Sequence, residues 1–198
     1  LSPCSTDLDF RIWHAGNPYN TELRPRLNHD TGCLGSPLKL LRCRIYLMIS
    51  RDDLPIGPGA YALAIKIETP VSLLLPSMPS IKIPPGCHIY CGSARGPGGI
   101  RARVGRHLMH EKKVRWHVDQ LTIPGEIIAV LVAAHSSHSN DQTECDLLER
   151  VLACVGSKIP VSGFGSSDCK ICPAHLVTLA PDTSLAGIMM ANEVLLGG

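Results

Sequence analysis

The residue types that could act on a charged ligand gather in one stretch of the chain, residues 86–117. Between Arg95 and His117, seven Lys and Arg side chains stand against one acid, which gives a local charge of +6 in a chain of net charge +2. Positive charge that is focused in one place attracts phosphate groups. We therefore expect a phosphate-binding surface in this stretch.

Two of these basic residues, Arg103 and His107, lie one helical turn apart. Apolar residues recur at every fourth position from Ile100, which predicts a helix from about Gly99 to His110 with one apolar stripe. Arg103 and His107 would share one edge of that stripe, half-buried and facing a sheet. The alternative is an exposed basic face of the helix.

Five further basic residues would attract a phosphate backbone in a general way. Arg101 would lie at the other edge of the apolar stripe, and Arg106 would point furthest into water. The residues predicted to act by attraction alone are Arg101, Arg106, Lys112, Lys113 and Arg115.

One carboxylate, Glu144, lies at an unusual position on a second helix, predicted over Asp141–Val155. It precedes Leu147 and Leu148 by three and four residues, so it shares their inward face. A carboxylate on an apolar face is unfavourable unless it is paired, hydrogen-bonded or bound to a cation. Glu144 could be a ligand of a hard ion such as Mg²⁺, or it could form a capping box with Asp141.

Three further residues in the basic region and before it carry aromatic or imidazole groups. Tyr61 and Tyr90 lie on predicted strands in a chain that has only 4% aromatic residues. Buried tyrosines are usually core residues with a bonded hydroxyl, although these two could also face a site. His117 follows Trp116 and has no partner that the spacing reveals.

A compact Cys/His cluster, Cys169-x-x-Cys172-x-x-His175, has the spacing of a metal site. Zinc takes four ligands, and the fourth could be Cys145, Cys154 or Cys91. A set of free buried thiols is the equal alternative. A thioredoxin-like redox pair is less favoured, because no helix begins at this CxxC.

The elements that must position these residues are short strands between glycine and proline breaks. Residues Ala60–Ile67 alternate in the manner of a strand, and His88–Cys91 predicts a second one. The continuous apolar run Ile127–Ala133 is typical of a central strand, and Leu176–Leu179 of an edge strand. Strands and two helices together favour a mixed fold.

Composition and breaks divide the chain into three parts. Prolines interrupt residues 1–56, which we expect to be a flexible or loosely packed N-terminal extension. The domain is expected over 57–180, with a tail over 181–198. No apolar stretch is long enough to cross a membrane, and nine cysteines without a recognisable signal predict a reducing, cytoplasmic location.

These residues together resemble the GIY-YIG nuclease family. Gly59-Ala60-Tyr61 is similar to the GIY strand and Tyr90-Cys91-Gly92 to the YIG strand, with Ala and Cys in place of Ile. Arg103 and His107 match the family's helix. A closer resemblance, over about residues 57–180, is to a GIY-YIG-like domain of unknown function found alone or fused to endonuclease III in archaea and bacteria. Its signatures here are Tyr-Cys-Gly-Ser-Ala, Gly-Gly-Ile-x-x-Arg-Val-x-Arg-His, Trp116-His117-Val-Asp119, Thr-Glu144-Cys145 and Gly163-Phe-Gly-Ser-Ser-Asp168-Cys169-x-x-Cys-x-x-His175-Leu.

The chain departs from ordinary GIY-YIG nucleases at three points. Residues Arg95–Gly99 lengthen the turn before the helix, and the Cys/His cluster is an addition. The family's late asparagine has no clear match, although Ser166 or Asp168 occupies that region.

The resemblance implies an α+β fold, a small α/β sandwich with a central, mainly antiparallel sheet flanked by helices and a C-terminal Cys/His cluster. It also implies a metal-dependent endonuclease that hydrolyses DNA phosphodiester bonds, linked to DNA repair and to a base-excision repair enzyme as partner. The charge pattern does not distinguish DNA from RNA.

The resemblance also assigns roles. Glu144 would hold Mg²⁺ or Mn²⁺, Tyr61 would orient or deprotonate the attacking water, and Arg103 would stabilise charge on the phosphate. Phosphate binding or proton relay would fall to Tyr90, His107 and His117. Backbone N–H groups near Gly92 and Ser93 would approach a phosphate.

Two other functions fit the same residues. One is a nucleic-acid-binding module that keeps the fold without cleaving. The other is a protein-interaction domain stabilised by Zn²⁺ at Cys169, Cys172 and His175.

Overall fold

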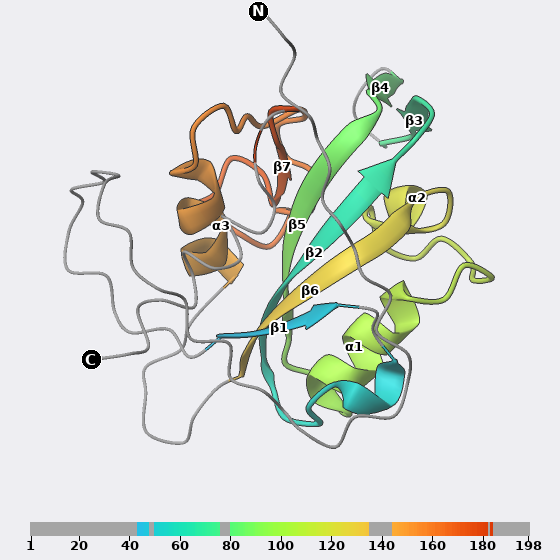
Figure 1. Cartoon of the computed structure of the whole chain (residues 1–198), viewed down its shortest axis with the longest axis vertical. Coiled ribbons are helices and arrows are strands. Elements are labelled where there is room, and N and C mark those ends of the chain that lie inside the picture. Colours follow the sequence, from blue (N-terminus) through green and yellow to red (C-terminus); the bar gives the residue numbers. More distant parts are fainter. Residues whose placement is uncertain (1–42, 48–49, 76–79, 135–143, 182, 184–198) are drawn as a thin grey trace, which may run out of the picture. The chain divides into compact units, whose positions relative to one another are not determined.

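The computed structural model describes residues 43–47, 50–75, 80–134, 144–181 and 183 (Figure 1). Five strands form one antiparallel sheet in the order β1-β6-β2-β5-β7, and β3 and β4 form a separate hairpin. The strands are β1 (Cys43–Leu47), β2 (Gly59–Ile67), β3 (Val71–Leu73), β4 (Ile81–Ile83), β5 (Gly86–Ala94), β6 (Glu126–Ala134) and β7 (Leu176–Thr178). The helices are the 3-10 turn η1 (Arg51–Asp53), α1 (Gly99–His107), α2 (Asp119–Thr122) and α3 (Glu144–Leu152).

The sheet has a different helix layer on each face, with α1 and α2 on one side and α3 on the other (Figure 1). Successive residues of a strand point to opposite faces. Tyr61 and its alternate neighbours on β2 therefore pack with Ile100 and Val104 of α1, whereas Ala60 and the other alanines pack with Leu147 of α3. The predicted α+β fold with an antiparallel sheet between helices is confirmed.

Helix α1 begins as expected at Gly99 but ends at His107, three residues before the predicted end. Its first turn is held by residues 55–57, which lie just before β2. The N–H groups of Ile100 and Arg101 donate to the carbonyls of Gly57 and Pro55. This approach requires Gly99, which has φ +54° and whose Cβ would overlap the neighbouring carbonyl oxygens. The short turn at residues 55–57 thus fixes the position of α1 on the sheet.

Part of the predicted N-terminal extension belongs to this folded unit. Strand β1 pairs with β6 from Cys43 to Leu47, and Leu54 is fully buried in the core that α1 covers. Residues 1–42 of that extension and 184–198 of the predicted tail lie outside the described residues. Within the part described, no helix has the length and apolar character needed to cross a membrane.

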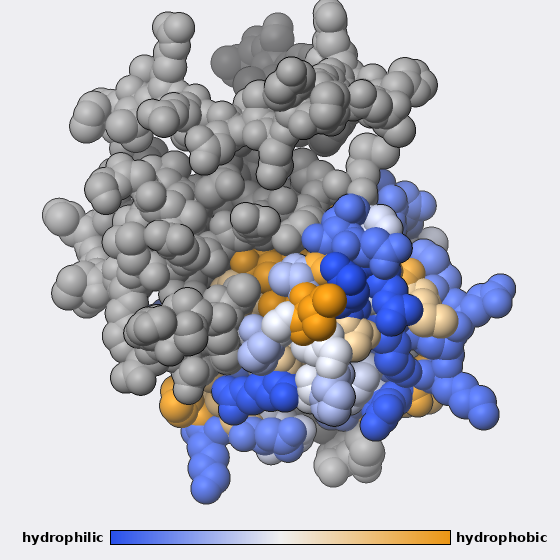
Figure 2. All heavy atoms as spheres, turned by 90° about the horizontal axis from the view of Figure 1, so that it is seen from below, coloured by the Kyte–Doolittle hydropathy of each residue, from blue (hydrophilic) through white to orange (hydrophobic). Residues whose placement is uncertain are grey.

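Among the residues coloured in Figure 2, hydrophilic side chains cover much of the face that is seen from below. That side carries η1 and α1 (Figure 1). The described exposed residues there include Arg51, Asp52 and Asp53 of η1, so charges of both signs are present. The hydrophilic surface over η1 is therefore not a purely basic one.

Candidate functional site

A cleft of about 350 Å³ is formed where β2, β5, α1, α3 and the loop before β7 meet. Most of the residues predicted to act on a phosphate line it: Tyr61, Tyr90, Gly92, Ser93, Arg103, His107, Arg115, His117 and Glu144. Cys169 and His175 of the Cys/His cluster line it as well. Arg101, Arg106, Lys112, Lys113 and Cys172 are not among its lining residues.

Tyr61 and His107 form a buried hydrogen-bonded pair at the bottom of the cleft. The tyrosine oxygen lies 2.9 Å from Nε2 of His107, and the two side chains are 2% and 1% exposed. Strand β2 supplies the tyrosine from its α1 face, and the histidine closes the last turn of α1. Gly92 on the paired strand β5 leaves room for this tyrosine, because a Cβ there would lie 2.7 Å from its ring.

Burial keeps both members of this pair uncharged near neutral pH. Burial, together with the nearby Tyr90, raises the pKa of Tyr61 well above its ordinary value. Burial also disfavours the charged form of His107, and for a base this lowers the pKa. The nearby Lys112 and Arg103 lower the pKa of His107 further, whereas Asp119 raises it. A neutral imidazole has one donor and one acceptor nitrogen, so its tautomer decides the direction of the bond to Tyr61.

Asp119, a fully buried carboxylate on α2, favours one of the two tautomers. Its Oδ1 lies 3.7 Å from Nδ1 of His107. This distance is too long for a hydrogen bond, yet a negative charge there favours a proton on Nδ1. Nε2 is then the acceptor, and the hydroxyl of Tyr61 donates to it.

The carboxylate of Asp119 is saturated with donors. It accepts two bonds from Nη1 of Arg106, at 2.9 and 3.0 Å, and one each from the backbone N–H groups of Arg115 and Trp116. Burial alone would raise the pKa of this carboxyl, but the His107 ring, the two backbone donors and Arg106 together hold it well below its usual range. Sequence reasoning did not assign Asp119 a role, although it is an acid directly beside a strongly basic stretch.

Two residues that were predicted to attract phosphate serve this network instead. Arg106, expected to point furthest into water, is paired with Asp119 and also donates to the carbonyl of Lys113. Lys112 has a side chain only 3% exposed, and its Nζ donates to the carbonyl of His107 over 2.7 Å and to Thr122 over 2.8 Å. These contacts anchor the last turn of α1 to α2.

Arg103 is held over an aromatic ring at the cleft. Its guanidinium lies 4.3 Å from the centre of the Trp116 ring, and Arg106 and Arg115 lie 4.5 and 5.2 Å from the same ring. Stacking on an indole orients the planar guanidinium while its N–H groups stay available. Arg103 and Arg115, which both line the cleft, can therefore present donors to an anion there.

Glu144 reaches the cleft from the first residue of α3. Its Oε2 is buried and has no hydrogen-bond partner among the described residues, and the guanidinium of Arg95 lies 3.9 Å away. A buried carboxylate oxygen without a hydrogen bond fits a cation ligand. Asp168 also lines the cleft, so a second carboxylate is available. The alternative capping partner, Asp141, lies outside the described residues.

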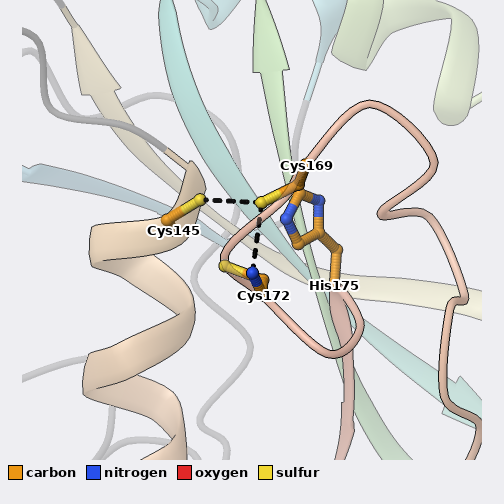
Figure 3. Close-up of side chains that lie close together, drawn as sticks. All are labelled: Cys145, Cys169, Cys172 and His175. Carbon is orange, nitrogen blue, oxygen red and sulfur yellow. Dashed lines mark hydrogen bonds between the residues drawn. The ribbon is translucent and has the colours of Figure 1, made fainter.

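The Cys/His cluster contains four ligand atoms (Figure 3). Cys145 of α3 joins Cys169, Cys172 and His175, and their ligand atoms all lie within 4.8 Å of one another. The fourth member, left open by the sequence, is therefore Cys145 rather than Cys91 or Cys154. Thiols and imidazole favour zinc over magnesium, so the cluster could hold a metal ion of that kind.

Local hydrogen bonds make one thiol of the cluster acidic. The backbone N–H of Cys172 donates to Sγ of Cys169 over 3.2 Å and lowers the pKa of that thiol to about 6. Burial instead raises the pKa of Cys145. One thiolate at neutral pH is thus compatible with the fold even before a cation is considered.

Comparison with known proteins places the chain in a family without assigning its chemistry. No curated protein and no solved structure matches it. Residues 60–194, more than half of the chain, match the family model described as a domain of unknown function, DUF123. The chain therefore belongs to the DUF123 family.

Proposed function

We propose that this cleft hydrolyses phosphodiester bonds of DNA, with a divalent cation bound at Glu144. The observation that carries the proposal is the presence in one cleft of Arg103, the buried Tyr61–His107 pair and the buried carboxylate oxygen without a hydrogen bond. Arg103 can bind the negatively charged phosphate, the Tyr61–His107 pair can accept a proton, and the carboxylate of Glu144 can bind a metal ion. Metal-dependent hydrolysis of a phosphate ester uses all three.

Arg103 is the residue that would stabilise the reacting phosphate. Negative charge grows on the phosphate oxygens during attack, and a pre-oriented guanidinium stabilises that charge without reorganising. The stack on Trp116 supplies this orientation. Arg115 lies further from the same ring and is more suited to a flanking phosphate.

Tyr61 and His107 would move the proton of the attacking water together. Tyr61 alone is a poor base near neutral pH, because burial raises its pKa and the hydroxyl therefore stays protonated. In the paired arrangement the tyrosine oxygen takes a proton from water while the hydroxyl proton passes to Nε2 of His107. The water oxygen attacks as hydroxide, and the imidazolium that forms faces Asp119 at 3.7 Å.

The cation ligands would be Glu144 and Asp168. Mg²⁺ commonly takes one or two carboxylates and completes its shell with water and substrate phosphate oxygens. When bound, such an ion polarises the phosphate and stabilises the leaving oxygen. Tyr90 and His117 also line the cleft and would contact the substrate, as would the backbone at Gly92 and Ser93.

The resemblance of these strands and helices to the GIY-YIG nucleases supports the same reaction. The link to DNA repair and to a base-excision repair enzyme rests on that resemblance alone. A binding module that does not cleave remains the alternative outcome of the following experiment.

The test is cleavage of supercoiled and branched DNA by the full chain with Mg²⁺ or Mn²⁺. We expect Glu144→Gln to lower the rate by about 100-fold or more, since a metal-bound carboxylate supports several kcal/mol of charge stabilisation. The matched control is Asp146→Asn, which removes a negative charge from an exposed position two residues away on the same helix. Equal losses in both variants, or DNA binding without cleavage in either metal, would refute the proposal.

A further inference from the structure

The Cys/His cluster lies beside the cleft but takes no part in the proposed reaction. We propose that Cys145, Cys169, Cys172 and His175 bind one Zn²⁺ ion, and that this ion fixes the first turn of α3 so that Glu144 faces the cleft. The zinc site stands independently of the proposed nuclease activity. Only the consequence for catalysis through Glu144 depends on that proposed function.

The spacing of the ligand atoms suits zinc. In a tetrahedral site with Zn–S bonds of about 2.3 Å, two sulfurs lie about 3.8 Å apart. The sulfurs of Cys145 and Cys169 are separated by 3.5 Å, and the whole set spans no more than 4.8 Å. A small movement of the side chains would therefore bring all four atoms to bonding distance.

An independent observation comes from the imidazole. His175 is 4% exposed, and its Nε2 is buried without a hydrogen-bond partner among the described residues. The ring turns one nitrogen towards the sulfurs in Figure 3. A buried ring nitrogen that lacks a partner is unfavourable, and a bound cation removes that cost. A set of free buried thiols would leave this nitrogen unexplained.

The ligands come from two parts of the chain that the ion would join. Cys145 lies on the first turn of α3. Cys169, Cys172 and His175 lie in the loop that leads to β7, with His175 directly before the strand. The loop is itself tied to the sheet, because the N–H of Cys91 on β5 donates to the carbonyl of His175 over 2.9 Å. Zinc would thus attach the start of α3 to the sheet through this loop.

Glu144 is the residue directly before a proposed zinc ligand. Its backbone can move little while Cys145 is bound to a fixed ion, so its carboxylate would remain directed at the cleft. Without the ion, Cys145 is linked to the loop by weak thiol contacts to Cys169, at 3.5 Å, and to Cys172. We therefore assign the zinc a positioning role.

The first experiment is elemental analysis of the purified full chain. We expect about one zinc per chain, falling below about 0.1 in Cys172→Ser, because a structural site needs all four ligands. The matched control is Cys154→Ser, which removes a thiol just after the end of α3 that is not in the cluster and whose loss should leave zinc unchanged. Less than about 0.1 zinc per chain after incubation with zinc under reducing conditions, or an equal loss in the control, would overturn the proposal.

The second experiment measures the coupling and needs no variant to fold. Zinc is removed from the wild-type chain with a chelator and then restored, and amide hydrogen exchange is followed at Leu147 and Leu148. We expect exchange there to speed up by at least about tenfold on removal and to recover on restoration, because the first turn of α3 opens more often. Unchanged exchange would overturn the positioning role.

The two proposals fail in different ways. Zinc that binds and protects α3 in a chain without any cleavage would refute the nuclease and leave the zinc site intact. Metal-dependent cleavage by a chain that binds no zinc would refute the zinc site and leave the nuclease intact.

Discussion

The carboxylate of Asp119 and the imidazole of His175 in the Cys/His cluster are both buried, and they differ in how well they are satisfied. The carboxylate of Asp119 accepts four hydrogen bonds at 2.8 to 3.0 Å. The cluster has a buried nitrogen of His175 without a partner and one sulfur–sulfur contact at 3.5 Å. A saturated carboxylate is complete without any ligand, whereas a buried ring nitrogen without a partner points to a ligand unless a charged group lies close by, as Asp119 does 3.7 Å from the unpartnered Nδ1 of His107.

The same distinction sorts the basic residues around the cleft. Arg106 and Lys112 are paired or bonded within the Asp119 network, so little of their charge is available to a substrate. Arg103 and Arg115 line the cleft. A high local charge in the sequence therefore contains both structural and ligand-facing cations.

The largest expected effect comes from removing the centre of the saturated network. Asp119→Asn would leave Arg106 and Lys112 without their negative partner, and breaking a buried ion pair in this way lowers the unfolding free energy by about 3–5 kcal/mol. Urea denaturation measures this loss. Glu111→Gln is the matched control, because Glu111 is an exposed acid in the segment between α1 and α2. A loss below about 1 kcal/mol for Asp119→Asn would mean that the network is not structural.

Two adjacent lysines, one inside the Asp119 network and one outside it, allow a second comparison with a smaller expected loss of stability. Lys112→Ala removes buried bonds to the end of α1 and should lower the unfolding free energy by about 1–3 kcal/mol. Lys113→Ala, at an exposed position, should change it by less than about 0.5 kcal/mol. Denaturation of both variants under one set of conditions decides the matter, and equal losses would contradict the assignment of Lys112 to the network.

The pH dependence of stability gives the smallest expected effect. Burial lowers the pKa of His107 in the folded chain, so the unfolded chain binds this proton more readily. The associated stability is complete above the ordinary histidine pKa of about 6.5 and declines below it, by at most about 1.4 kcal/mol per pH unit. Burial lowers the pKa of His88 as well, which adds a second contribution of the same sign.

Unfolding free energies between pH 5 and 7 test this expectation. His107→Gln should show a shallower decline on acidification than the wild type, whatever its stability at pH 7. His110→Gln, which removes an exposed imidazole, supplies the matched control. A wild-type stability that rises on acidification in this range would contradict a neutral buried His107.

Sequence patterns predicted the parts of the fold that depend on local order. The alternation along β2 placed Tyr61 on the same face as Leu63 and Ile65, and the fourfold spacing placed Arg103 and His107 at one edge of the apolar stripe of α1. The patterns could not predict the ion pair between Arg106 and Asp119, because it joins two helices across an irregular loop. Nor could they choose Cys145 among three cysteines, since that choice depends on how α3 lies against the sheet.

Crystals of the full chain with uncleavable DNA and Mn²⁺, measured at the manganese and zinc absorption edges, test the central claim most directly. The claim is that the cleft at Glu144 and the adjoining Cys/His cluster hold two different metals. We predict a manganese signal at Glu144 beside a phosphate that Arg103 contacts, and a zinc signal among Cys145, Cys169, Cys172 and His175. DNA bound away from the cleft, with no manganese at Glu144, would contradict the account.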